Sequence, residues 1–410
     1  MKMNKFFAML TMFAVVAGFA ACGGDDEEET GAGGTPSAPA TGLNAYPNRV
    51  VSANGIVLAA SKQFVEVGST EEIQLAVYKD GVDVTASATI YQIVNGKDQK
   101  VNGTKVVCSE VGTYSFWASY KGNNTKQDAV LSITTLSARP ALAADAQPAA
   151  SDFVRKVLLV QGTGIACQYC PNAIKAIKDF YATSKWAEHT YLMALHTYTS
   201  GDPLYSAGAE KLRIQAGFSG YPVMLLNFDS EYFGSSMNSA SFYAFLNNSV
   251  AEILDADNDG DNDDAEVGIS IATAYNAETG VISVNSAIKC DDPAKYKVTA
   301  VLLQDNVYFR QTGALDESQN IHEAGVKAIS PANGAGFALN SGELTKEGAT
   351  YEYCCEFSKD DLVPTTGAQY TLDVLRDARI LVYVQANGKV VENVAVCGMN
   401  EQVGFAYEAE

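Results

Sequence analysis

Two cysteines three residues apart, between a short apolar run and a helical pattern, constrain this chain more than any other feature. Val157–Val160 predicts a buried strand, and after Pro171 the apolar residues recur at helical spacing. Cys167 and Cys170 are therefore expected at a helix start, where unpaired backbone N–H groups stabilise a thiolate. The arrangement predicts a redox dithiol in which Cys167 is the nucleophile and Cys170 resolves the mixed disulfide.

The same residues have other interpretations. The pair can be a static disulfide that pins a loop, although Cys-x-x-Cys beside a strand–helix–strand pattern favours redox chemistry. A zinc site is disfavoured because no second Cys/His pair has metal-ligand spacing. His196 ends the next predicted strand and could lower a thiol pKa, but His196 and His189 are more typical of hydrogen-bonded core residues.

The first residues have the pattern of an export signal. Lys2 and Lys5 precede an apolar run at 6–19 that is too short for a confident membrane span, and small residues follow up to Cys22. The stretch 1–21 resembles a bacterial lipoprotein signal peptide, which implies that Cys22 is the lipidated, palmitate-bearing first residue of the mature protein. The alternative is an ordinary cleaved secretory signal. Either export route permits disulfides.

Residues 22–45 are expected to be a flexible tether, because they combine an acidic run with a Gly/Ala/Thr/Pro/Ser-rich segment. The acidic run at 25–29 resembles the surface-export signal of Bacteroidetes lipoproteins. The resemblance implies an outer-membrane partner through the lipid anchor and exposure at the cell surface. The periplasmic leaflet is the alternative location.

Charge and length limit the remaining possibilities. The formal net charge of the 410 residues is −20, and no basic patch offsets it, so we expect no nucleic-acid partner. A chain of this length predicts two or three domains. Alternating strands and turn signals at 46–135 predict an immunoglobulin-like sandwich, in which Cys108 is a small buried residue. Residues 136–152 are Ala- and Pro-rich and predict a linker.

The segment 153–254 follows the order strand, Cys-x-x-Cys helix, strand, helix, and a strand that begins at a proline. This order resembles the thioredoxin fold, whose cis-proline loop matches Gly220-Tyr221-Pro222-Val223. With the motif at 163–171, the chain is similar to Bacteroidetes lipoproteins related to a 28-kilodalton outer-membrane protein. The resemblance implies a thioredoxin-like domain that acts on protein thiols or disulfides, with Pro222 shaping the substrate groove. The alternative is a non-enzymatic protein that contacts surface ligands or partner proteins.

The sequence departs from the thioredoxin pattern at two positions. Gln161 stands where a buried acid is usual, six residues before Cys167, and its amide cannot exchange a proton. Ala166 stands where a tryptophan is common. These departures predict a slow dithiol or one that is mainly oxidised.

A dense acidic segment follows at 255–266, and it matches the spacing of a calcium loop at every specified position. Gly260 permits the sharp turn, and the preceding residues predict an amphipathic helix. The pattern favours a structural calcium ion at the joint between domains, and the alternative is a solvated linker. We expect no organic cofactor. The predicted ligands are Asp255, Asp257, Asp259, Asp261, Asp263 and Glu266.

Residues 267–410 contain alternating or apolar runs between turns, which predict a C-terminal β-sandwich. One disulfide is plausible among Cys290, Cys354, Cys355 and Cys397, with open connectivity. The predicted fold class is therefore multidomain α/β plus all-β: a thioredoxin-like domain flanked by an immunoglobulin-like sandwich and a second β-sandwich.

Overall fold

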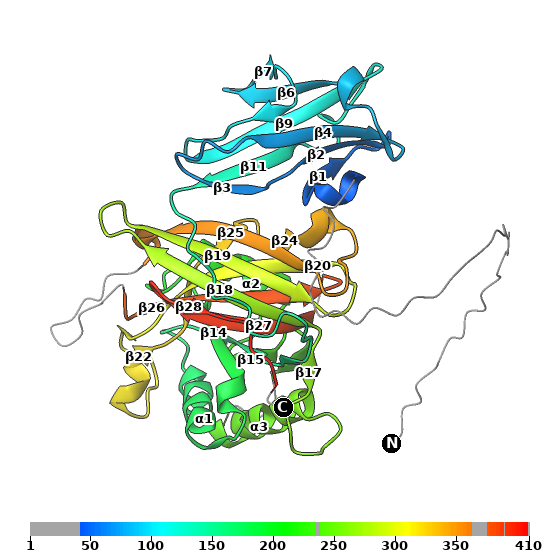
Figure 1. Cartoon of the computed structure of the whole chain (residues 1–410). Coiled ribbons are helices and arrows are strands. Elements are labelled where there is room, and N and C mark those ends of the chain that lie inside the picture. Colours follow the sequence, from blue (N-terminus) through cyan, green and yellow to red (C-terminus); the bar gives the residue numbers. More distant parts are fainter. Residues whose placement is uncertain (1–41, 234–237, 363–374, 389, 409–410) are drawn as a thin grey trace, which may run out of the picture. The chain divides into compact units, whose positions relative to one another are not determined.

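A computed structural model describes residues 42–233, 238–362, 375–388 and 390–408 (Figure 1). The expected signal peptide, Cys22 and the acidic run lie outside the described residues. Thr41–Glu410 forms one compact unit. The described part contains 28 strands and three α-helices. No helix among these residues is long and apolar enough to cross a membrane.

The N-terminal third folds into two sheets around one core. The first sheet contains β1 (Asn48–Val51), β2 (Ile56–Ala60), β4 (Ile73–Lys79), β5 (Val82–Asp83) and β8 (Lys105–Val106). The second contains β3 (Phe64–Glu66), β6 (Thr89–Val94), β7 (Lys97–Lys100), β9 (Gly112–Tyr120), β10 (Asn123–Asn124) and β11 (Leu131–Leu136). Alternate residues of β2, β4, β9 and β11 point inward and form the buried cluster. The opposite face of β2 and β4 is covered as well, because Val57, Ala76 and Tyr78 form a second buried cluster.

A nine-stranded mixed sheet forms the centre of the remaining chain. It contains β13 (Val157–Thr163), β14 (Thr190–His196), β15 (Val223–Leu226), β16 (Ser230–Tyr232), β20 (Tyr296–Gln304), β23 (Gly325–Ser330), β24 (Phe337–Ala338), β26 (Ala378–Ala386) and β27 (Val390–Gly398). β13 pairs parallel with β14 and antiparallel with β15. All seven residues of β13 are buried, which explains why its first part, Val157–Val160, is a continuous apolar run.

Helices cover both faces of the β13 region. α1 (Cys170–Thr183) and α3 (Ser239–Leu254) pack together on one face (Figure 1), and Leu159, Phe180 and Leu246 belong to the buried cluster there. α2 (Ala207–Ala216) packs on the other face, and its N-cap Ser206 accepts a hydrogen bond from the Ala209 N–H. α1 therefore connects two parallel strands, and its first turn stands at the C-terminal end of β13.

A four-stranded sheet covers the far part of the central sheet. It contains β18 (Val267–Tyr275), β19 (Val281–Cys290), β25 (Thr350–Ser358) and β28 (Gln402–Val403). Leu302 and Ile380 pack against this second sheet, whereas their neighbours Val301 and Leu381 face the α2 side. This alternation with period two places β20 and β26 in two cores at once.

The short elements complete the description. Two small sheets pair β12 (Phe153–Val154) with β17 (Asp264–Ala265), and β21 (Val307–Tyr308) with β22 (Ile321–His322). The 3-10 helices are η1 (Gly42–Ala45), η2 (Thr85–Ser87), η3 (Ala187–His189), η4 (Glu317–Asn320), η5 (Leu339–Gly342) and η6 (Lys359–Asp361).

The predicted fold class is wrong. The described chain is mostly β, and β13, β14 and β15 do not close an α/β domain of their own. β14 pairs with β23, and the sheet continues through β20, β26 and β27, so the described residues form neither a separate thioredoxin-like core nor a separate C-terminal sandwich. The N-terminal sheets are not an isolated flanking module either, because Phe64 and Leu136 belong to the core cluster of the C-terminal sheets. Pairing with β23 covers the edge that β14 would otherwise expose.

Candidate functional site: a covered disulfide and an acidic loop

The predicted dithiol is present as a disulfide. Cys167 and Cys170 are bonded, with their Cα atoms 5.4 Å apart, and Cys170 is the first residue of α1. Pro171 occupies the first helical turn, where its missing N–H costs no intrahelical hydrogen bond. Cys170 is fully buried and Cys167 is only 2% exposed, so Cys167 is the more accessible of two poorly accessible sulfurs.

A buried hydrogen-bond network holds the loop before the disulfide. The Asp202 carboxylate accepts a hydrogen bond from the Ile165 N–H (2.8 Å), and the same oxygen lies 3.4 Å from Nδ1 of His196. Burial by itself raises the pKa of Asp202, but hydrogen bonds from His196 and two backbone N–H groups outweigh it and lower that pKa. His196 therefore supports the loop through Asp202, which is the core role that its position favoured.

A distant segment covers the disulfide loop. We call residues 309–320 the strap. Within it, the Gln311 amide donates to the carbonyls of Cys167 (3.0 Å) and Gly164 (3.2 Å), and the Thr312 N–H donates to Ile165 O (2.8 Å). The Gln319 amide donates to Pro171 O (2.7 Å).

Sequence reasoning missed both supports of the loop. Asp202 and the strap glutamines carry no motif, and their contacts join residues more than thirty positions apart. No signal in a single sequence could have identified them.

Pro222 lies at the same end of the sheet as the disulfide. The Tyr221–Pro222 peptide is cis, as expected, and Val223 pairs with Gly162 of β13. The ring of Tyr221 packs edge-on against Tyr198, whose N–H donates to Thr163 O. These contacts bring the proline loop to the strand end from which the disulfide loop departs.

The two departures from the thioredoxin pattern have different surroundings. Gln161 is buried, and its amide nitrogen has no hydrogen-bond partner in the described part of the chain. Ala166 is exposed. Neither residue supplies a group that can take up or release a proton beside Cys167.

The other described cysteines are all free and buried: Cys108, Cys290, Cys354, Cys355 and Cys397. The disulfide that we considered plausible in the C-terminal region is therefore absent. Burial raises the pKa of the Cys108 thiol to about 11 and that of Cys290 to about 12, so both remain protonated and unreactive at neutral pH.

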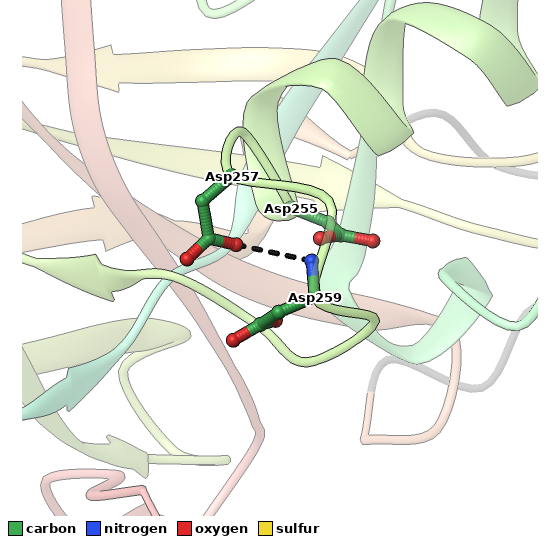
Figure 2. A group of neighbouring side chains, drawn as sticks. All are labelled: Asp255, Asp257 and Asp259. Atoms are coloured by element: carbon green, nitrogen blue, oxygen red, sulfur yellow. Dashed lines mark hydrogen bonds between the residues drawn. The ribbon is translucent and has the colours of Figure 1, made fainter.

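The acidic segment after α3 forms an exposed loop. Figure 2 shows Asp255 at the end of the helix and Asp257 and Asp259 on the loop, and one oxygen from each lies within 4.8 Å of the others. Each carboxylate accepts a backbone N–H within the loop: Gly260 donates to Asp255 (3.1 Å), Asp259 to Asp257 (3.2 Å) and Asp261 to Asp259 (2.9 Å).

The remaining predicted ligands do not join this group. Asp263 accepts a hydrogen bond from the Ala256 N–H (2.8 Å). Burial raises the pKa of Glu266, and the nearby carboxylates of Asp292, Glu392 and Asp291 raise it further. The structure therefore clusters the carboxylates of Asp255, Asp257 and Asp259, whereas a backbone carbonyl ligand from Asp261 and a water-mediated contact from Asp263 stay predictions. Three carboxylates are suitable donors for a hard cation such as calcium, which takes six to eight oxygens, so carbonyls and water would complete the set.

No protein-family profile and no curated protein matches the chain, whereas solved structures resemble part of it. Among solved structures, HBP35 of Porphyromonas gingivalis matches with a TM-score of 0.49 and 18% identity, over 64% of this chain and 80% of that one. A protein from Agrobacterium tumefaciens matches with a TM-score of 0.37 and 12% identity, over 62% of this chain and 99% of that one.

Neither match shows a relationship to the 28-kilodalton outer-membrane protein or to a thioredoxin-like domain.

Proposed function

We propose that this chain is an outer-membrane lipoprotein that exchanges disulfides with extracytoplasmic proteins through Cys167 and Cys170. The observation that carries the proposal is the disulfide itself, formed at the N-terminus of α1 and beside the Pro222 loop. The helix start stabilises the thiolate that leaves when this bond is broken. Pro222 would present its flanking backbone to an extended substrate segment, as an added β-strand.

The exchange balances as follows. A substrate thiolate attacks Sγ of Cys167, forms a mixed disulfide and releases Cys170 as a thiolate, which takes a proton from solvent. A second substrate thiolate then attacks the substrate sulfur and releases Cys167. The substrate gains one disulfide, and the pair gains two electrons and two protons as two thiols. A substrate disulfide reverses each step.

The reduction potential of the pair tests the proposal. Thr41–Glu410 is equilibrated across a glutathione series, quenched in acid and alkylated, and the peptide that contains both cysteines is quantified by mass spectrometry. A midpoint between about −270 and −120 mV, the range of disulfide oxidoreductases, supports exchange. The Cys170→Ala variant is the trap, because it should capture substrate proteins as mixed disulfides at Cys167. The matched Cys167→Ala variant is the control and should capture none.

A second candidate function has a specific observation in its favour. Cys167 is 2% exposed and lies beneath the Gln311 amide, which suits a structural disulfide in a non-enzymatic surface protein. A midpoint below about −300 mV, together with no trapped partner, would favour this alternative and contradict exchange.

The lipid anchor is a separate part of the proposal. Cys22 follows small residues and an apolar stretch, which is the pattern for lipidation, and the acidic run after it favours the cell surface over the periplasmic leaflet. Labelled palmitate should enter the wild-type chain and not the Cys22→Ala variant. Protease added to intact cells should degrade a surface-exposed chain and spare one in the periplasmic leaflet. Label in both chains would contradict anchoring at Cys22.

We also propose that the loop after α3 holds a structural calcium ion. Asp255, Asp257 and Asp259 would supply carboxylate ligands, and the ion would neutralise their mutual repulsion. Calcium at ten times a dissociation constant of about 1 mM should stabilise folding by about 1.4 kcal/mol, measured by thermal unfolding. Asp257→Asn should lose this gain and Glu231→Gln, an exposed control, should keep it. An equal gain in stability in both variants would show that calcium does not bind at this loop.

A further inference from the structure

A cavity of about 830 Å³ lies between α1, β14 and the segment around β22. Its volume falls within the range of small-molecule sites. Most of the lining is apolar, with Ile174 and Ile177 of α1 opposite Leu192 and Ala194 of β14. The disulfide does not line this cavity, so a ligand there would not depend on thiol chemistry.

The inner end of the cavity carries unmet hydrogen-bonding groups. Gln161 is 3% exposed and Thr163 is 2% exposed, and both line the cavity from the end of β13. The Gln161 amide nitrogen and the Thr163 hydroxyl have no hydrogen-bond partner among the residues that the structure describes. Leaving a buried polar group unpaired costs about 1–3 kcal/mol, so these two atoms favour a guest that can bond to them.

Three charged side chains of the lining, Lys178, Glu188 and Glu323, are half-buried or exposed, so an uncharged guest is favoured only at the buried end of the cavity. At the inner end, burial and the neighbouring His196 lower the pKa of His322 to about 3, so this ring is neutral at pH 7. At the mouth, the Arg379 guanidinium donates to both oxygens of Asp305, and this carboxylate neutralises its positive charge. A charged head group at the inner end would lose its hydration without gaining an opposite charge.

We propose that this cavity binds an uncharged amphipathic small molecule, whose apolar body lies along α1 and whose carbonyl or hydroxyl group bonds to Gln161 and Thr163. Water is a poor occupant of most of the space, because along Ile174, Ile177 and Leu192 it would lack polar partners. An apolar body displaces that water favourably, and the polar group satisfies the inner end. The site is distinct from the proposed exchange function and does not require it.

Prodan, an uncharged naphthalene ketone whose emission shifts to the blue in a dry site, is a direct probe. Thr41–Glu410 with its disulfide intact should bind it saturably with a blue shift. Ala182→Trp changes an exposed residue of α1 that lines the cavity, and should abolish binding. Lys175→Trp is the matched control, because Lys175 is exposed on the same helix and does not line the cavity.

A second comparison tests the polar end. The double variant Gln161→Leu with Thr163→Val should bind Prodan about tenfold more weakly, the effect of one lost buried hydrogen bond. It should bind the same dimethylaminonaphthalene without the ketone at least as tightly as wild type. No saturable shift, binding that Ala182→Trp leaves intact, or an equal loss for both probes would overturn the proposal. Failure of disulfide exchange would leave all these results unchanged.

Discussion

The disulfide loop and the acidic loop are held in opposite ways. The loop at 164–171 is fixed by partners far along the chain, such as Asp202 and Gln311. The loop at 255–263 is fixed mainly by its own residues, as where the Asp259 N–H donates to Asp257. Cys167 is buried, whereas Asp257 and Asp259 are exposed. Thiol chemistry at the disulfide loop therefore depends on whether Asp202 and Gln311 release that loop. The acidic loop, by contrast, is accessible to ions in solution.

The largest expected effect comes from removing the strap's contact with the disulfide loop. Gln311→Leu removes the hydrogen bond to the Cys167 carbonyl and should destabilise the fold by about 1–3 kcal/mol. If the strap must lift before reduction, dithiothreitol should reduce the disulfide about tenfold faster in this variant, since tenfold corresponds to about 1.4 kcal/mol. Acid-quenched thiol trapping measures this rate.

Gln99→Leu is the matched control for that experiment. Gln99 lies exposed on β7 and away from the strap, so its substitution should leave the reduction rate unchanged. Equal rates in wild type and Gln311→Leu would show that the strap does not limit access to the sulfurs. The contrast between a covered loop and an open loop would then fail.

The second prediction concerns His322, at the base of the strap, where its Nε2 lies 3.0 Å from Phe309 O. Its folded pKa is depressed to about 3, mainly by burial and then by His196, while Asp202 opposes the shift and Lys178 adds to it. The His322 ring therefore takes up a proton near pH 6.5 in the unfolded chain, but only near pH 3 in the folded chain. This contribution to stability is complete above pH 6.5 and decreases as the pH falls toward 3.

Between pH 7 and pH 5 the His322 contribution should cost about 2 kcal/mol of unfolding free energy. His322→Gln should remove most of that slope in urea unfolding at the two pH values. His189→Gln, at a half-buried ring, should flatten the slope less. Identical slopes in wild type and His322→Gln would mean that the folded chain accepts the proton without penalty.

The same contrast explains what the sequence could predict. Local patterns identified the strand at β13, the helix that begins at Cys170 and the strand at β14, because each depends on residues close together in the chain. The cis bond before Pro222 was implied by the resemblance of its loop to that of the thioredoxin fold. They also identified the acidic loop, whose converging carboxylates stand two residues apart. The fold class failed because the pairing of Ala194 with Gly325 joins residues more than a hundred positions apart.

At both candidate sites, the features set by local spacing were predictable, and those set by distant contacts were not. The disulfide followed from the Cys-x-x-Cys spacing, but its cover did not, because Gln311 and Gln319 are ordinary polar residues until the chain folds. Glu266 fits the calcium pattern by spacing, yet it lies beside Asp291 and Asp292 rather than with the three clustered carboxylates. Residue 266 directly precedes β18, and that strand fixes its direction more strongly than the loop motif does.

The smallest expected effect concerns Lys185, a cation beside the acidic loop. Lys185 donates to Gly260 O (3.0 Å), and its ammonium lies 4.0 Å from the Asp255 carboxylate. This cation repels any calcium ion bound there, but it is 61% exposed, so screening limits the effect. Lys185→Gln should therefore tighten calcium binding by only about twofold at low salt, measured by titration calorimetry.

Lys175→Gln removes the same charge from α1 beside Asp179, and it should leave the calcium affinity unchanged. Salt should erase the difference between wild type and Lys185→Gln, because the interaction is exposed. If Lys185→Gln weakens calcium binding instead, then its bond to Gly260 O organises the loop. The acidic loop would in that case also depend on a distant partner, since Lys185 precedes it by seventy positions and more.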